Sequence, residues 1–446
     1  MRILMLTDDV QIDRRILLEA ESLICQGNEV ILLAMSDGGD RAFETIGNVK
    51  VERVSGNELP YSEMVVLKVF NLYFKFIAFA FSFINAISQI IANRISSKIG
   101  RILFFLSRKT NSAFVLLGYK LRSTLILLHK RLRKLSTHER FILQRALFYR
   151  PDILHAHDLP QLKVAAYASN KFKIPLVYDA HELYPEIASL LPVQKRKLSS
   201  LEQKYIKRAN AVITVNSYIA DEMCQRYKIA KPTVLLNATN QPEYFDNAKK
   251  YDLFRNELNI EPHKKVILFQ GWMSKQRGLQ NLVRALAAMP NEIVLVFMGY
   301  GEAKSELLDI AIDLGCVERV YFKDAVPQSE LLYWTASADI GVIPYQAIDL
   351  NNYLCSPNKL FEFIQAGLPI LANDLPYLRE VVFGEGFGVV SSLDSPEEYA
   401  EGLLTLLDES YYQKCKEQLS LKREKYSWRE QEHTLFEVYD SLTHAT

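Results

Sequence analysis

The amino-acid sequence predicts an α/β protein with two doubly wound domains that meet at a cleft. Short apolar segments alternate with longer amphipathic ones, as in "RILMLT", "RRILLEAESLICQG" and "EVILLAM" near the start. The alternation restarts at "HKKVILFQG", after a polar stretch. With 446 residues, of which 49% are hydrophobic, the chain is long enough to bury two cores.

The first domain is expected over residues 1–240. Its later strands are predicted in "DILHAHD", "PLVYDAHE" and "AVITVN", with helices in "LPQLKVAAYASNKF" and near 194–208. A short strand in "KPTVLLNATN" closes it. Crossover helices between such strands imply a parallel sheet, whose ligands bind at the carboxyl ends of the strands.

The second domain is expected over residues 241–427. Strands are predicted in "HKKVILFQG", "EIVLVFMGYG", "VYFKD", "ADIGVIPY", "PILAND" and "GFGVVSS", with amphipathic helices between them. Residues 428–446 contain "WREQEHTLFEVYDSL", an amphipathic helix with Trp428 that we expect to dock on the protein.

A basic insertion over residues 61–148 interrupts the first domain. Thirteen Lys or Arg and no Asp or Glu lie between Met64 and His138, which we call the basic block. The rest of the chain carries 40 basic and 52 acidic residues, a net charge of −12. Such asymmetry predicts a separate functional surface.

Residues 76–92, "FIAFAFSFINAISQIIA", contain no charge and are at the lower length limit for a membrane-spanning helix. Asn85, Ser88 and Gln89 are polar for such a span. We expect instead one or two interfacial helices whose cations meet anionic lipid headgroups. The alternatives are a span or a helical subdomain packed on its own protein. Nucleic acid is not an expected partner, because long apolar runs separate the cations.

The five cysteines are scattered and form no CxxC pair, which argues against a disulfide framework or a structural zinc site. The opening "MRILMLT" leads directly into a strand and has no signal-peptide pattern. A cytoplasmic protein is expected, associated peripherally with the inner face of the cell membrane through the basic block.

The segment "SPNKLFEFIQAGLPILAND", residues 356–374, carries the clearest chemistry. With Ser356 as N-cap and Pro357 at the first helical position, free backbone N–H groups would form an anion site that Lys359 completes. Glu362 follows one turn later, where it could accept hydrogen bonds from ribose hydroxyls. The alternative is an exposed Lys–Glu pair worth a few tenths of a kcal/mol.

Two further turns support a diphosphate ligand. "FQGWMSKQRGLQNLV" places Gly271 after a strand and Arg277 just before a helix. "FMGYGE" repeats the glycine turn at Gly299 and Gly301. Three such turns, two of them with cations, favour a nucleoside diphosphate.

The His-x-His pair His155 and His157 is not expected to bind a metal. We interpret the residues of such a pair as alternating between strand faces, and no third ligand is evident. Asp158 and Asp179 are interpreted as loop or cap residues. Glu182 could contact acceptor or donor, or cap a helix.

The motifs also resemble a known family. "FQGWMSKQRGLQNLVRAL", "FMGYGE", "ADIGVIPY" and "SPNKLFEFIQAGLPILAND" are similar, in order and spacing, to the donor-binding half of GT-B glycosyltransferases, specifically the retaining family 4 enzymes. "DRRILLEAESLICQGNEV", "DILHAHDLPQL" and "LVYDAHELYPE" resemble the acceptor half of one bacterial branch, which builds envelope polysaccharide. This resemblance implies two Rossmann-like domains, metal-independent catalysis and a C-terminal helix that crosses back to the first domain.

The resemblance also implies roles for individual residues. Glu362 matches a glutamate that holds the donor ribose, Lys359 and Arg277 match cations on the pyrophosphate, and His181 matches a histidine near the transferred sugar. The implied catalytic residues are His181, Arg277 and Lys359, with Asp158 and Glu182 as acceptor-side candidates. The implied donor-binding set is Gly271, Arg277, Gly299, Gly301, Ser356, Pro357, Asn358, Lys359, Leu360 and Glu362.

Three departures from the family pattern stand out. Leu354 replaces a glutamate that usually touches the sugar, and Trp272 replaces an arginine, which leaves Lys275 or Arg277 to supply the charge. "TDDVQIDRR" takes the place of a glycine-rich turn.

The expected activity is transfer of a sugar from a nucleoside-diphosphate sugar to a lipid-linked glycan, with retention of configuration. A nucleotide-sugar epimerase or hydrolase on the same fold is the alternative enzyme. A non-catalytic membrane-bound scaffold is the other alternative, because Leu354 and Trp272 depart from the donor site. No G-x-G-x-x-G follows the first strand, which argues against a nicotinamide dehydrogenase.

Overall fold

The computed structural model describes residues 1–37, 42–55 and 135–443, together with six single positions between 72 and 90. The chain forms two compact units. One comprises Met1–Ala34, Phe43–Glu52 and Pro151–Thr446, and the other Met35–Ala42 and Arg53–Arg150.

The first of two sheets has the strand order β3-β4-β2-β1-β5-β6-β7-β8. Pairing is parallel between β1 and β2 and from β1 through β5, β6 and β7 to β8. The strands β5 and β6 are buried along their whole length, as expected for a parallel sheet covered on both faces. The strands are β1 (Arg2–Leu6), β2 (Glu29–Met35), β3 (Ala42–Ile46), β4 (Val49–Val54), β5 (Ile153–His157), β6 (Leu176–Ala180), β7 (Ala211–Thr214) and β8 (Thr233–Val234).

Amphipathic helices connect these strands. The helix α1 begins after Asp13, whose carboxylate accepts a hydrogen bond from the backbone N–H of Arg15 and so caps the helix. The helices and helical turns of this part are α1 (Arg14–Cys25), α5 (Asp158–Phe172), η1 (Tyr184–Glu186), α6 (Pro192–Tyr205), η2 (Ile206–Arg208) and α7 (Ser217–Tyr227).

The second sheet has the strand order β11-β10-β9-β12-β13-β14, and all its pairings are parallel. Both of its faces are covered by apolar clusters. The predicted pair of doubly wound domains is therefore confirmed. The strands are β9 (Lys265–Gln270), β10 (Ile293–Met298), β11 (Val320–Lys323), β12 (Ile340–Ile343), β13 (Ile370–Asn373) and β14 (Gly388–Ser391).

The helix α13 (Asn358–Gln365) lies unusually close to this sheet. Its side chains from Lys359 to Gln365 are all buried. Gly341 in β12 permits the approach, because a Cβ atom there would lie 2.6 Å from the ring of Phe363. The other helices and helical turns are α8 (Leu253–Glu257), η3 (Lys275–Arg277), α9 (Leu279–Ala288), α10 (Lys304–Asp313), η4 (Val317–Arg319), α11 (Gln328–Thr335), α12 (Leu350–Tyr353), α14 (Pro376–Leu378), the π-helical turn η5 (Arg379–Phe383), α15 (Pro396–Leu407), α16 (Glu409–Lys422) and η6 (Arg423–Tyr426).

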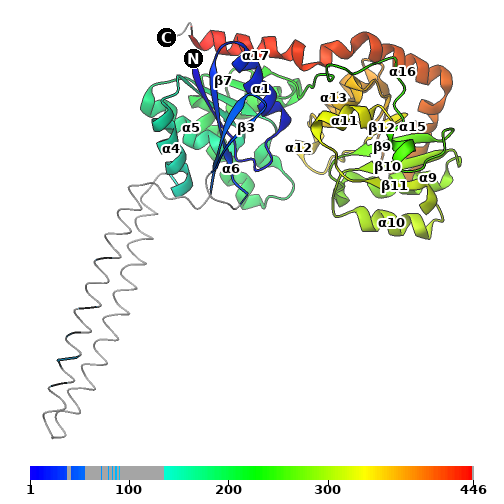
Figure 1. Ribbon diagram of the computed structural model, residues 1–446, viewed down its shortest axis with the longest axis horizontal. Coiled ribbons are helices and arrows are strands. Elements are labelled where there is room, and N and C mark those ends of the chain that lie inside the picture. The colour runs from blue at the N-terminus through cyan, green and yellow to red at the C-terminus, as the bar shows by residue number, and fades with distance from the viewer. Residues whose placement is uncertain are drawn as a thin grey trace. The chain divides into compact units, whose positions relative to one another are not determined.

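The last helix, α17 (Trp428–Thr443), packs on the core of the first sheet, where it runs alongside α1 (Figure 1). Trp428 is 2% exposed, and its indole N–H donates to the hydroxyl of Ser22 in α1 at 2.8 Å. The hydroxyl of Tyr439 lies 2.8 Å from Nδ1 of His155 in β5. The C-terminal segment is thus part of the first-sheet core.

The second compact unit is described mainly through α4 (Thr137–Tyr149). A capping box begins this helix: Ser136 Oγ accepts from the N–H of Glu139, and the Glu139 carboxylate accepts from the N–H of Ser136. Most of the basic block, including most of residues 76–92, lies outside the described residues. In the part of the chain that the structure describes, no helix combines the length and apolarity needed to cross a bilayer.

Six positions within the basic block are described, namely 72, 79, 83, 86, 87 and 90, and all are helical and exposed. Five of them carry large apolar side chains, namely Leu72, Phe79, Phe83, Ile87 and Ile90. Their spacings of three, four and seven residues are typical of a single helix face.

Candidate donor site

The N-terminus of α13 begins one residue later than the sequence predicts. The N-cap is Pro357 and not Ser356, and α13 starts at Asn358. The Ser356 hydroxyl is buried and makes no capping hydrogen bond. The first backbone N–H groups of a helix have no partner within the helix, so the anion site predicted at this position is still available. Leu360, another member of the implied donor-binding set, packs in the hydrophobic core, where its side chain is fully buried.

Lys359 is a buried cation without a carboxylate partner among the described residues. The residue is 7% exposed, and its Nζ atom lies 3.9 Å from the centre of the Phe269 ring and 5.3 Å from that of Tyr345. Burial, reinforced by the nearby charge of Arg277, holds the pKa of Lys359 well below its usual value. A cation so disfavoured would gain from an anion bound beside it.

Arg277 lies against the same tyrosine. Its guanidinium carbon is 3.5 Å from the centre of the Tyr345 ring, and Nη1 is buried without a hydrogen-bond partner. Burial lowers the pKa of Arg277 to about 10. Lys275, the other candidate cation of this loop, is instead exposed and points toward Glu306, 3.7 Å away. The structure therefore brings Arg277 and Lys359 together.

The predicted glycine turns adopt backbone conformations that favour glycine. Gly271, Gly299 and Gly301 have φ angles of 110°, 138° and 151°. A Cβ atom on Gly299 would lie 2.3 Å from the carbonyl oxygen of Gly271, and one on Gly301 equally close to that of Met273. The loops after β9 and β10 are thus in direct backbone contact.

The carboxylate of Glu362 is held on both oxygens. Oε2 accepts from the side-chain amide of Gln270 at 2.5 Å, and Oε1 accepts from Nη1 of Arg14 at 2.6 Å. The hydroxyl of Thr335 donates to the amide oxygen of Gln270, which turns the amide nitrogen toward Glu362. Arg14 and Gln270 are contacts that the sequence analysis did not identify.

His181 follows β6 and lies between two carboxylates. Its backbone N–H donates to Asp158 Oδ1 at 2.9 Å, and its Nε2 lies 3.2 Å from Asp179 Oδ2. Burial favours the neutral ring, but Asp158 and Asp179 outweigh burial and raise the pKa of His181 to about 10. At neutral pH His181 is therefore an imidazolium.

The acceptor-side candidates lie next to His181. Asp158 begins α5 with a φ of 59°, and burial raises the pKa of its carboxyl to about 7. Glu182 accepts from the side-chain amide of Asn351 in α12 at 2.8 Å, while Asn351 Oδ1 accepts from the N–H of Leu183. These bonds attach the loop after β6 to the segment that precedes α13.

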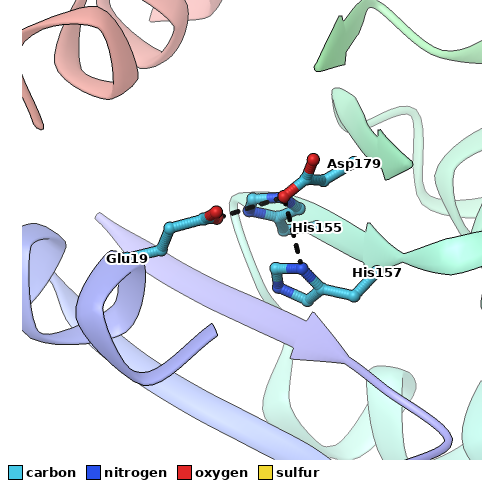
Figure 2. Close-up of side chains that lie close together, drawn as sticks. All are labelled: Glu19, His155, His157 and Asp179. Carbon is cyan, nitrogen blue, oxygen red and sulfur yellow. Dashed lines mark ion pairs between the residues drawn. The ribbon is translucent and has the colours of Figure 1, made fainter. Parts of the chain in front are cut away.

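A fully buried cluster of titratable side chains is formed by Glu19 of α1, His155 and His157 of β5, and Asp179 of β6 (Figure 2). It adjoins His181, whose Nε2 lies 3.2 Å from Asp179 Oδ2 and 3.3 Å from His157 Nδ1. Arg15 connects the two carboxylates, since its Nε donates to Glu19 and its Nη2 donates to both oxygens of Asp179. The interpretation of Asp179 as a loop or cap residue is wrong, because it is a strand residue with no exposed surface.

The two reasons given against a metal site at His155 and His157, opposite strand faces and no third ligand, are also wrong. His155 and His157 lie on one face of β5, with their rings stacked at 4.2 Å, because residues two apart on a strand share a face. Glu19 and Asp179 add two potential ligands, all within 4.8 Å of one another. Arg15 already supplies a counter-cation to both carboxylates, which makes a divalent ion there electrostatically costly. Metal-independent action stays a prediction.

The departures from the family pattern also have structural consequences. Leu354 is buried and its carbonyl accepts from the amide of Asn216, so this position has a packing role. Trp272 is 52% exposed and its indole N–H donates to Glu302 at 3.0 Å. "TDDVQIDRR" supplies Asp13, Arg14 and Arg15, which make the contacts described above.

Two family descriptions match the chain. "Glycosyltransferase Family 4" matches residues 102–240, and "Glycosyl transferases group 1" matches residues 264–409. The two matches correspond to different domains, and the second includes Arg277, Lys359 and Glu362.

Curated relatives share about a quarter of their aligned residues with the chain. An uncharacterized glycosyltransferase of Methanocaldococcus jannaschii is 25% identical over 288 residues, which cover 62% of this chain and 72% of that protein. A D-inositol 3-phosphate glycosyltransferase of Xylanimonas cellulosilytica is 24% identical over 315 residues, which cover 66% and 72%.

Solved structures share the architecture at lower identity. HepE from Anabaena, in complex with UDP, has a TM-score of 0.66 at 15% identity over 99% of this chain and 100% of its own. Sucrose-phosphate synthase from Thermosynechococcus elongatus has a TM-score of 0.65 at 14% identity, with both chains fully covered. With matches in both domains and this shared architecture, the chain belongs to the glycosyltransferases of the GT-B fold.

Proposed function

We propose that the protein moves a sugar from a nucleoside-diphosphate sugar to a glycan carried on a lipid, with retention of configuration. The reaction would take place in the cytoplasm at the inner face of the cell membrane, as a step in polysaccharide assembly. The donor half of this proposal rests on the described site. The acceptor half rests on the basic block and on the family resemblance.

The observation that carries the donor assignment is the pair of cations at the start of α13. Lys359 and Arg277 share the ring of Tyr345, and neither has a carboxylate partner among the described residues. Burial lowers the pKa of both side chains, and the charge of Arg277 lowers that of Lys359 further. A protein retains such an arrangement at a cost in stability, and a bound diphosphate offsets this cost. The UDP and UDP-glucose complexes of HepE support a nucleotide-sugar donor.

The same groups suit the chemistry of transfer. Negative charge grows on the departing diphosphate as the bond to the sugar breaks, and Lys359, Arg277 and the N-terminus of α13 would stabilise that charge. His181 as an imidazolium would add a further positive group near the transferred sugar, where a neutral ring would contribute less.

The lipid-linked acceptor is supported by the composition of the basic block. Each cation near an anionic membrane surface contributes about 1 kcal/mol, so thirteen of them allow strong but salt-sensitive binding. The exposed apolar side chains at Leu72, Phe79, Phe83, Ile87 and Ile90 suit insertion between headgroups. A cytoplasmic enzyme bound in this way would reach a sugar on a lipid carrier.

The direct experiment supplies purified protein with a panel of nucleotide sugars and measures nucleotide release with and without a lipid-linked glycan. We expect nucleotide release that depends on the acceptor. With a donor labelled in its sugar, the label should appear in the lipid-linked product, and the new linkage should keep the anomeric configuration of the donor. Donor isomerisation, or release that ignores the acceptor, would favour the epimerase or hydrolase. Absence of any donor turnover would favour the scaffold.

Membrane binding is tested separately by sedimentation with anionic liposomes at low and high salt. We expect binding that is lost at high salt and weakened by charge reversal at Lys130, Arg131, Arg133 and Lys134, with donor binding unchanged. Reversal of the exposed charges Lys249 and Lys250, outside the basic block, is the matched control. A protein that stays in the supernatant at low salt would overturn the membrane proposal.

A further inference from the structure

The carboxylate assigned to the donor ribose has a protein hydrogen-bond partner on each of its oxygens. One oxygen of Glu362 accepts from Arg14 at 2.6 Å and the other accepts from Gln270. A ribose presents two hydroxyl donors to a carboxylate in a similar way. The side chains of Arg14 and Glu362 are only 14% and 9% exposed, so water competes little with the hydrogen bond between them. A ribose can bind Glu362 only if it displaces Arg14 or shares the carboxylate with it.

Arg14 is only partly satisfied where it lies. Its Nη1 donates to Glu362, its Nη2 makes a long contact of 3.5 Å with the carbonyl of Asn237, and its Nε is buried without a partner. A guanidinium has five N–H donors, and burial makes each unmade hydrogen bond costly. A ligand that offered several acceptor oxygens would therefore satisfy this side chain better than its present partners do.

Arg14 is also close to the start of α13. It is the first residue of α1, and the capping residue of α1, Asp13, accepts from the side-chain amide of Asn358 at 3.3 Å. Asn358 is the first residue of α13 and precedes Lys359. The positive ends of two helices, each at least two turns long, therefore meet where the diphosphate is proposed to bind.

We propose that Arg14 is a donor-binding residue that exchanges partners. In the empty enzyme it occupies Glu362, and when the ribose hydroxyls take this carboxylate the guanidinium turns to the diphosphate. The inference rests on the proposed donor site and adds a specificity rule to it. A ligand with a ribose but no phosphates must displace Arg14 without offering it a new partner. A nucleoside diphosphate provides both a ribose for Glu362 and phosphates for Arg14.

The test compares a nucleoside diphosphate with its parent nucleoside. Wild type is screened by calorimetry against UDP, GDP, ADP, CDP and TDP, and the tightest ligand and its nucleoside are then titrated into Arg14→Ala. We expect the diphosphate to bind about tenfold more weakly, since a hydrogen bond to a charged group is worth about that much or more. The nucleoside, whose binding is followed by NMR, should bind Arg14→Ala at least as tightly as it binds wild type. Arg379→Ala is the matched control, because Arg379 pairs with Asp374 and is 61% exposed.

A conservative variant separates this role from a structural one. Arg14→Lys keeps the charge and should retain most of the diphosphate affinity, and thermal melts confirm that each variant is folded. Equal weakening of nucleoside and diphosphate in Arg14→Ala, or no change in either, would overturn the exchange of partners while leaving the donor site intact. If wild type binds none of the five diphosphates, the donor site itself fails.

Discussion

Replacing Arg277 with methionine should stabilise the ligand-free protein while weakening donor binding. Burial lowers the pKa of Arg277 from its ordinary 12.5 to about 10, and each tenfold change in an equilibrium constant corresponds to about 1.4 kcal/mol. Holding this cation in the empty site thus costs about 3 kcal/mol. Because the side chain is partly exposed, solvent screening reduces the cost to about 2 kcal/mol.

The stacking of the guanidinium on Tyr345 offsets part of this cost. A cation over an aromatic ring contributes about 1 kcal/mol, and the unbranched methionine side chain keeps the apolar contact with the ring. The net gain in stability for Arg277→Met is therefore about 1 kcal/mol, or a rise in Tm of about 2–4 °C for a domain of about 200 residues.

The assay is calorimetric melting with and without a nucleoside diphosphate. Wild type should gain stability from the ligand by mass action, and Arg277→Met should gain much less. Arg379→Met removes an exposed arginine and should change neither quantity. A lower Tm for Arg277→Met combined with wild-type ligand stabilisation would refute the reasoning and make Arg277 a structural residue.

The remaining predictions concern Glu362 and His181. Glu362→Gln should weaken nucleoside-diphosphate binding about tenfold or more in calorimetry, because it removes a charged acceptor, whereas exposed Glu417→Gln should have no effect. His181→Ala should lower transfer and leave nucleotide affinity intact, with the exposed His263→Ala as control. Wild-type transfer rates in His181→Ala would leave His181 only a structural role as a capping residue. Because Asp158 and Asp179 raise its pKa to about 10, His181 stabilises the fold below pH 6.5, and this contribution is lost as the pH rises toward 10. An NMR titration should show a protonated ring at pH 8, and a midpoint near 6.5 would contradict this.

The local geometry of the candidate donor site could be predicted because its signals are local. Glycine turns after strands, a proline at a helix start and a lysine in the first turn each follow from short-range backbone chemistry. The error at Ser356 was a shift of one residue, with Pro357 taking the capping position. Helix boundaries vary by this much without a change in the site.

The partners of Glu362 could not be predicted, because they come from distant parts of the chain. Arg14 is 348 positions away and Gln270 is 92 positions away. Gln270 carries no local pattern that marks it as a contact. The one available signal was the pair of adjacent arginines in "TDDVQIDRR", at the start of a helix where a cation is electrostatically disfavoured.

The buried cluster behind His181 was missed for a related reason. His155 and His157 were identified in the sequence, but Glu19 and Asp179 join them only when β5, β6 and α1 pack together. The face assignment was an error of strand periodicity and could have been avoided. The counter-charge from Arg15 is a tertiary contact with Asp179 that sequence spacing does not reveal.

The most direct test of the donor site is a structure of the protein with its nucleoside diphosphate. We predict that the phosphates lie within hydrogen-bond distance of Lys359 and Arg277 at the start of α13, with the ribose hydroxyls on Glu362 and Arg14 turned away from that carboxylate. A nucleotide bound elsewhere, or one seated with the Arg14–Glu362 pair intact and Lys359 without a phosphate contact, would contradict the account.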